Sequence, residues 1–107
     1  MPDDVLTRLM QVIESRKCDR PEGSYTTQLF AGGAPRITAK VVEEAGELVE
    51  AANANPPVAR QVIHEAADLV YHLMVLLAQC DVTLEDLEAE LARRFGVSGL
   101  EEKAARG

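Results

Sequence analysis

Acidic side chains gather at two places in the sequence, and their spacing suits metal chemistry. The segment 43–50 holds four glutamates and no basic residue. A second pair, Glu65 and Asp68, lies in an apolar stretch, and no lysine or arginine occurs from 61 to 92. Residues three or four positions apart share one face of a helix, so each group predicts a cluster of carboxylates on one helix face.

The two acidic groups can meet across a helical hairpin. The break NANPP at 53–57 separates them, so the helices that carry them will pack antiparallel. The facing pairs are then Glu44 with Glu47, and Glu65 with Asp68. Burying several carboxylates together is costly without a cation, and all-oxygen ligand sets suit Mg²⁺ or Mn²⁺ rather than Zn²⁺. The pattern therefore indicates a divalent metal site.

The alternative is a solvated acidic face. Segment 43–50 taken alone favours that interpretation, because each like-charge pair costs only roughly 0.2–0.5 kcal/mol on an exposed helix. The second group shifts the balance, because the polar residues of its apolar helix form one narrow stripe: Gln61, Glu65, Asp68, His72 and Gln79. That stripe is too narrow, and its flanks too apolar, for a fully solvated face.

Helical periodicity and helix-breaking residues divide the whole chain into helices, and no segment alternates as a strand. A first helix begins at Asp3 or Asp4 and ends near residue 20, and a short helical turn runs from Ser24 to Gly32-Gly33. Further helices are predicted at about 36–54, 58–79, 83–95 and, as a short C-terminal helix, from 98. We predict an all-α bundle of four to five helices in a single domain, residues 1–107.

Composition limits the kind of protein. Hydrophobic residues make up 47% of the 107 residues and aromatics only 4%, which predicts an aliphatic core. The formal net charge of −7 disfavours nucleic acid and anionic membranes as partners. The longest apolar run, 73–78, is too short to span a bilayer, and Cys18 and Cys80 are interpreted as reduced thiols. We expect a soluble, cytoplasmic protein.

Several blocks of the sequence resemble one enzyme family. EEAGE (43–47) followed by EAAD (65–68) resembles the EExxE…ExxD signature of the MazG-like, all-α nucleoside triphosphate pyrophosphohydrolases. More closely, SYTTQLFAGGAPRITAKVVEEAGELVEAA (24–52), HEAADLVYHLMVLLA (64–78) and ELARRFGVSGLEEKAAR (90–106) are similar to blocks of the phosphoribosyl-ATP pyrophosphatases. The resemblance covers nearly the whole chain.

This resemblance implies an activity and an assembly. The expected reaction is Mg²⁺-dependent hydrolysis of phosphoribosyl-ATP to phosphoribosyl-AMP and pyrophosphate in histidine biosynthesis, with Mn²⁺ as an alternative cofactor. By the family pattern, the metal ligands are Glu44, Glu47, Glu65 and Asp68. The family's sites sit in intertwined helical dimers, which implies a homodimer or larger assembly. A phosphoribosyl-AMP cyclohydrolase on a separate chain would take the product onward.

The resemblance also suggests residues for catalysis and substrate binding. The expected catalytic residues are Glu43, Glu44 and Lys40, with Glu43 either ligating the metal or orienting water. The expected substrate-binding residues are Arg36, Lys40, Ser24, Tyr25 and Thr26. The structural alternatives are an ion pair between Lys40 and Glu44, a solvated Arg36, and a helix cap with a packed aromatic ring at 24–26.

Four further features have mainly structural interpretations. His72 is expected to be a hydrogen-bonded or core residue, because Mg²⁺ prefers oxygen ligands, and His64 a surface residue. The basic residues of 16–20 complement a helix C-terminus. A helix-interior glycine costs roughly 1 kcal/mol relative to alanine, so we interpret Gly46 as a sign of close packing beside the metal.

Three other functions are weighed against this one. A related pyrophosphohydrolase that clears non-standard nucleoside triphosphates would keep the metal site but change the substrate. A non-catalytic helical interaction module would leave the acidic stripe without a metal. A di-iron carboxylate bundle is disfavoured, because the ExxH pairs of such sites are missing.

Overall fold

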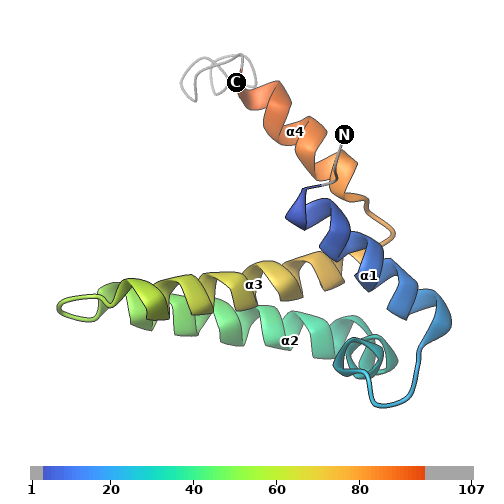
Figure 1. Ribbon diagram of the computed structural model, residues 1–107, viewed down its shortest axis with the longest axis horizontal. Coiled ribbons are helices and arrows are strands. Elements are labelled where there is room, and N and C mark those ends of the chain that lie inside the picture. The colour runs from blue at the N-terminus through green and yellow to red at the C-terminus, as the bar shows by residue number, and fades with distance from the viewer. Residues whose placement is uncertain (1–3, 96–107) are drawn as a thin grey trace.

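Four helices make up the part of the chain that the structure describes. The computed structural model describes residues 4–95, which form α1 (Val5–Asp19), α2 (Tyr25–Asn53), α3 (Ala59–Gln79) and α4 (Leu84–Phe95) (Figure 1). No strand occurs within this range, so the predicted all-α fold is confirmed. The helix predicted from residue 98 lies outside the described residues.

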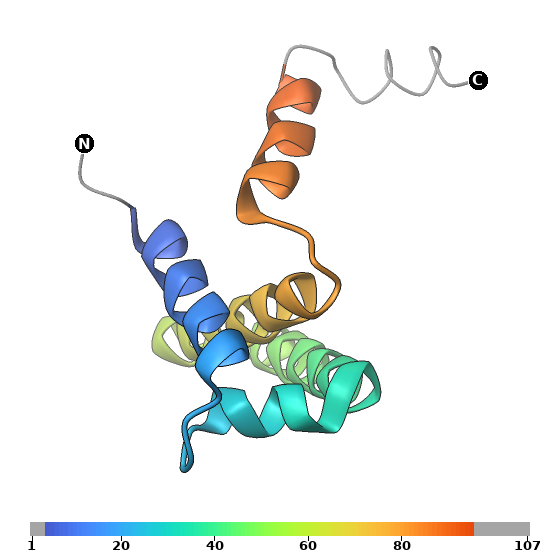
Figure 2. The same cartoon turned by 90° about the vertical axis from the view of Figure 1, so that its right-hand side faces the viewer.

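Helices α2 and α3 form a long antiparallel hairpin. They lie side by side along most of their length, α1 packs across one end, and α4 turns away from α3 by 111° (Figure 1 and Figure 2). The radius of gyration of 16.3 Å exceeds the about 13 Å of a compact domain of this size. In the described part, no single helix is long and apolar enough to cross a membrane; only α3 and α4 together, across their bend, meet that test by length and composition.

The hydrophobic core lies where α1 crosses the hairpin. It is mainly aliphatic, as predicted, and its buried side chains are Met10, Ile13, Leu29, Phe30, Ile37, Met74, Val75, Ala78 and Leu84. The rest of the hairpin lacks this cover, and its exposed apolar side chains include Val42, Val49, Val58 and Ile63. A single chain therefore leaves apolar surface on the hairpin in contact with water.

Local predictions for the helix starts are confirmed. The Asp4 carboxylate accepts a hydrogen bond from the Thr7 amide at 2.7 Å and so caps α1. Before α4, the Thr83 hydroxyl accepts from the Asp86 amide and the Asp86 carboxylate accepts from the Thr83 amide, which makes a reciprocal capping box. Both cysteines are free thiols, as predicted, and both are exposed.

A break inside α2 sets the direction of its first two turns. Gly33 has φ 72° and ψ −173°, a backbone conformation open essentially to glycine alone. The helical segment 25–32 therefore lies at an angle to 34–53 (Figure 2). This confirms the predicted stop at the glycine pair, and it places Tyr25 and Thr26 beside the last turns of α3.

Two of the three glycines of α2, Gly33 and Gly46, are expected to affect stability in opposite ways when each is replaced by alanine. Gly33→Ala is expected to lower the free energy of unfolding by about 1–3 kcal/mol, because an alanine cannot adopt this backbone without strain. A Cβ at Gly33 would meet only Pro35 Cδ, at 3.7 Å, so the cost comes from the backbone and not from a clash. Urea unfolding at equal protein concentrations measures it.

Gly46→Ala is the matched control on the same helix. A Cβ at Gly46 would meet no atom within 4 Å, so the interpretation of Gly46 as a close-packing glycine is wrong for the described chain. Gly46 lies on the face of α2 that carries Val42 and Val49, which are exposed. Gly46→Ala is expected to be neutral or to stabilise by up to about 1 kcal/mol. Equal losses from the two substitutions would contradict both expectations.

Candidate metal centre

Helices α2 and α3 bring three acidic side chains into one group. Glu44 and Glu47 lie about one turn apart on α2, and Glu65 lies on the facing side of α3. One carboxylate oxygen from each lies within 4.8 Å of the other two. Glu44 is only 6% exposed and Glu65 only 7%. The structure therefore brings together three of the four ligands expected from the sequence.

Two buried oxygens of this group have no hydrogen-bond partner. These are Glu44 Oε2 and Glu65 Oε2, for which the described residues supply no donor while Glu47 is ionised. The second oxygen of Glu65 accepts from Gln61 Nε2 at 2.7 Å. An unsatisfied buried acceptor costs about 1–3 kcal/mol, and more when it is charged. A divalent cation among the three carboxylates would satisfy both oxygens, so the residues present fit such an ion.

The pKa of the third carboxyl, that of Glu47, is raised by its two acidic neighbours. Hydrogen bonding to Glu65, and next to Glu44, raises the pKa of Glu47 to about 7. A proton held between Glu47 and its neighbours replaces part of the missing positive charge. Metal binding must displace this proton, because the metal takes the ionised carboxylate.

This pKa predicts how the stability of the metal-free protein depends on pH. A carboxyl whose pKa rises from 4.5 in the unfolded chain to about 7 on folding binds its proton more tightly in the folded state. Its contribution is present below pH 4.5 and is lost as pH rises through 7. Glu47→Gln is therefore expected to remove a downward slope of stability between about pH 5 and pH 7.5.

Urea unfolding in EDTA across this pH range measures the free energy of unfolding of variant and wild type. In the difference between the two, the contributions of the other titrating groups cancel. Glu50→Gln removes the same charge from an exposed position of α2 and should keep the wild-type slope. A Glu47→Gln profile parallel to wild type would show that Glu47 titrates normally.

Asp68 lies in a second, overlapping group. Its Oδ2 lies 3.4 Å from His64 Nε2, one helical turn earlier. The ligand atoms of His64, Glu65 and Asp68 lie within 4.8 Å of one another, so Glu65 belongs to both groups. The Asp68 carboxylate thus lies beside its i,i+4 neighbour His64 and outside the cluster of Glu44, Glu47 and Glu65. His64 is exposed, as predicted. The sequence interpretation did not include its pairing with Asp68, although the i,i+4 spacing was visible.

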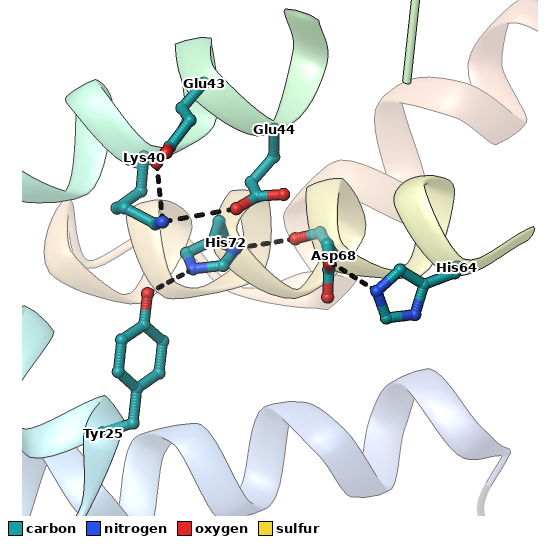
Figure 3. A network of polar contacts seen from close by, with 7 residues as sticks. All are labelled: Tyr25, Lys40, Glu43, Glu44, His64, Asp68 and His72. Carbon is teal, nitrogen blue, oxygen red and sulfur yellow. Dashed lines mark hydrogen bonds and ion pairs between the residues drawn. The ribbon is translucent and has the colours of Figure 1, made fainter. Parts of the chain in front are cut away.

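Lys40 lies at the edge of the acidic group and pairs with two glutamates. Its Nζ lies 2.6 Å from Glu43 Oε2 and 3.3 Å from Glu44 Oε1 (Figure 3). These contacts raise the pKa of Lys40, and Lys40 lowers the pKa of Glu43. The ion pair named as the alternative for Lys40 is therefore present. Glu43 is held by Lys40 and lies outside the three-carboxylate group.

Ser24 and Thr26 have structural partners. The Ser24 hydroxyl accepts from the Thr27 amide at 3.2 Å and caps α2, which is the structural alternative considered for it. Thr26 is buried, and its hydroxyl forms a short hydrogen bond with the Tyr71 hydroxyl. The contact of Thr26 with Tyr71 anchors the start of α2 against α3.

Tyr25 differs from its two neighbours because it is 43% exposed. Its hydroxyl lies 2.8 Å from Nε2 of the buried His72 (Figure 3). Burial raises the pKa of Tyr25, while the positive charges of Lys40 and Arg36 oppose the rise. The charges of these two cations therefore reach Tyr25. Arg36 itself is exposed.

Comparison with known proteins identifies the family. A family model described as phosphoribosyl-ATP pyrophosphohydrolase matches residues 6–95, which include both acidic groups. The chain belongs to this family. The resemblance seen in the sequence blocks is thus confirmed, and the phosphoribosyl-ATP pyrophosphohydrolase family is a family of hydrolases.

Individual relatives of the same family cover almost the whole chain. A phosphoribosyl-ATP pyrophosphatase of Rhodopirellula baltica is 52% identical over 109 aligned positions, which cover 99% of this chain and 91% of that protein. One from Methylococcus capsulatus is 48% identical over 103 positions, covering 96% of each chain. One from Rhodobacter capsulatus is 48% identical over 102 positions, which cover 95% of this chain and 97% of the Rhodobacter protein.

Proposed function

We propose that this chain hydrolyses phosphoribosyl-ATP to phosphoribosyl-AMP and pyrophosphate, with Mg²⁺ as its cofactor. Membership of the phosphoribosyl-ATP pyrophosphohydrolase family supports the substrate and the reaction. The observation that carries the proposal is the group of Glu44, Glu47 and Glu65, with two buried oxygens that lack a partner. A cation held by these carboxylates would neutralise charge on the phosphate oxygens during phosphoanhydride cleavage.

Glu44, Glu47 and Glu65 would hold the ion, and Asp68 would join them by turning away from His64. An all-oxygen ligand set suits Mg²⁺, with Mn²⁺ as a substitute. When bound, the metal supplies charge neutralisation at the phosphate oxygens and lowers the pKa of the attacking water.

The chain's own residues bind the substrate and handle the proton. Lys40 carries the cation nearest the acidic group, and it can exchange its contact with Glu44 for a phosphate oxygen. Lys40 lowers the pKa of Glu43 below its ordinary acidic value, so Glu43 stays ionised at neutral pH, as an exposed glutamate does. It can orient water or accept its proton, and Glu44 is the other acceptor in reach. Arg36, one turn before Lys40 and exposed, is proposed as a second contact to the phosphates.

The assembly is proposed to be a homodimer or larger. The exposed Val42, Val49, Val58 and Ile63 on the hairpin support this, because water-exposed apolar side chains favour a partner surface. The chain is proposed to be a single domain that works in the cytoplasm. A separate cyclohydrolase chain would consume its product.

A product assay tests the reaction. Phosphoribosyl-ATP, ATP and dUTP are incubated in parallel with the chain, each with Mg²⁺ and with EDTA. The expected result is phosphoribosyl-AMP and pyrophosphate from the first substrate alone, and only with Mg²⁺. Equal turnover of ATP or dUTP would indicate a pyrophosphohydrolase of other triphosphates. No turnover of any substrate would favour a non-catalytic helical module.

A further inference from the structure

His72 is a buried polar residue that the proposed metal site does not use. It lies on α3 one turn after Asp68 and is 4% exposed. Its ring makes edge contacts with two tyrosine rings, at centroid distances of 5.7 Å to Tyr25 and 5.0 Å to Tyr71. The hydroxyl of Tyr71 is itself bonded to Thr26. The imidazole is therefore held in one orientation between α2 and α3.

The hydrogen bonds of His72 determine which ring nitrogen carries the hydrogen. Nδ1 lies 2.7 Å from the backbone carbonyl oxygen of Asp68, which can only accept. Nδ1 must therefore be the donor. In the neutral ring Nε2 is then an acceptor, so the Tyr25 hydroxyl, 2.8 Å away, donates its hydrogen to Nε2. The hydrogen bonds run in one direction, from Tyr25 through His72 to Asp68 (Figure 3).

This direction decides what Tyr25 can offer to a ligand. The phenol has one hydroxyl hydrogen, and it is donated in the hydrogen bond to His72. A further hydrogen bond at the phenol oxygen can therefore only be accepted. Tyr25 is 43% exposed, and the charges of Lys40 and Glu44 both act on it. A phosphate oxygen, which is also an acceptor, gains nothing from this phenol oxygen.

We propose that His72 is a positioning residue that makes Tyr25 a hydrogen-bond acceptor for an N–H or O–H donor of the nucleotide, a ribose hydroxyl or the base amino group, and not a donor to phosphate. This inference rests on the proposed function for the identity of the nucleotide. It assigns the phosphates to Lys40 and the metal, and the donor groups of the sugar or base to Tyr25.

The state of the imidazole is measured first, without any substrate. ¹⁵N NMR of the uniformly labelled chain distinguishes the two tautomers of a histidine ring and its protonated form. The chain has only two histidines, so His64→Gln assigns the signals. The expected result at pH 7.5 is the Nδ1–H tautomer for His72. The Nε2–H tautomer, or a doubly protonated ring, would overturn the proposal whatever the enzyme's substrate is.

Kinetics with phosphoribosyl-ATP and Mg²⁺ then test the role of the pair. Tyr25→Phe is expected to raise KM by about three- to tenfold with little change in kcat, the loss expected for one hydrogen bond made equally in ground and transition states. His72→Leu should raise KM by a similar factor, and the double variant by no more than either. His72→Gln keeps an acceptor in place of Nε2 and should restore KM to near the wild-type value.

Pyrophosphate inhibition provides the control, because pyrophosphate contains no donor group when ionised. Its inhibition constant should be unchanged in Tyr25→Phe. Three results would each overturn the proposal. The first is weaker pyrophosphate inhibition of Tyr25→Phe, and the second is a KM in the double variant that multiplies the two single losses. The third is a His72→Gln variant that has a wild-type melting temperature but is as impaired as His72→Leu. A wild-type chain without turnover would instead overturn the proposed function, and the NMR result would still report the His72 tautomer.

Discussion

Glu65→Gln is expected to lower kcat/KM for phosphoribosyl-ATP by at least about 100-fold, because it removes a ligand from a cation that stabilises the transition state by several kcal/mol. Glu65 is the strongest choice because it is buried and belongs both to the cluster with Glu44 and Glu47 and to the cluster with His64 and Asp68. Glutamine keeps the shape of the side chain and can still accept the hydrogen bond from Gln61. Steady-state kinetics at saturating Mg²⁺ measure the loss.

The same substitution should not weaken the metal-free protein. Removing one of three crowded carboxylates relieves repulsion, so the free energy of unfolding in EDTA is expected to stay equal or rise. Glu50→Gln is the matched control, since Glu50 is exposed on the same hairpin and lies outside the cluster of Glu44, Glu47 and Glu65 and outside the cluster of His64, Glu65 and Asp68. Wild-type turnover in Glu65→Gln, or a loss of activity that follows a loss of fold, would contradict the proposed role.

Divalent cations are expected to stabilise the fold strongly. At a free Mg²⁺ or Mn²⁺ concentration of 100 times the dissociation constant, binding to the folded state alone adds about 2.7 kcal/mol. For a domain of this size that corresponds to a rise in melting temperature of roughly 10 °C or more. Thermal unfolding in EDTA and across a metal titration, at one protein concentration, measures the shift.

The stabilisation should depend on the three carboxylates and on pH. It should be largely lost in Glu65→Gln and kept in Glu50→Gln. It should also weaken below pH 7, because the ion must displace the proton on Glu47, whose pKa is about 7. An equal metal shift in wild type and Glu65→Gln would place the ion elsewhere on this acidic chain.

The hairpin and its acidic group could be predicted because local rules determine them. Spacings of three and four put Glu44 and Glu47 on one face, and the break at 53–57 makes the helices antiparallel. The stop at Gly32-Gly33 was also visible, because a glycine pair before a proline ends a helix. These features need no knowledge of distant contacts.

The side-chain arrangement could not be predicted in the same way. Whether Asp68 faces His64 or the α2 glutamates depends on a rotamer, and the spacing of the sequence permits both. The contact of Tyr25 with His72 joins residues 47 positions apart and depends on the angle at Gly33, which only the folded backbone defines. Gly46 was misinterpreted because the cost of a glycine inside a helix does not reveal what surrounds the position.

The most direct test of the metal centre is anomalous scattering from crystals grown with Mn²⁺. The expected result is a manganese peak within ligand distance of Glu44, Glu47 and Glu65, with Asp68 turned from His64 towards the ion. A well-occupied peak held only by His64 and Asp68, or no peak at a Mn²⁺ concentration that supports turnover, would contradict the proposal that these three glutamates hold the catalytic cation.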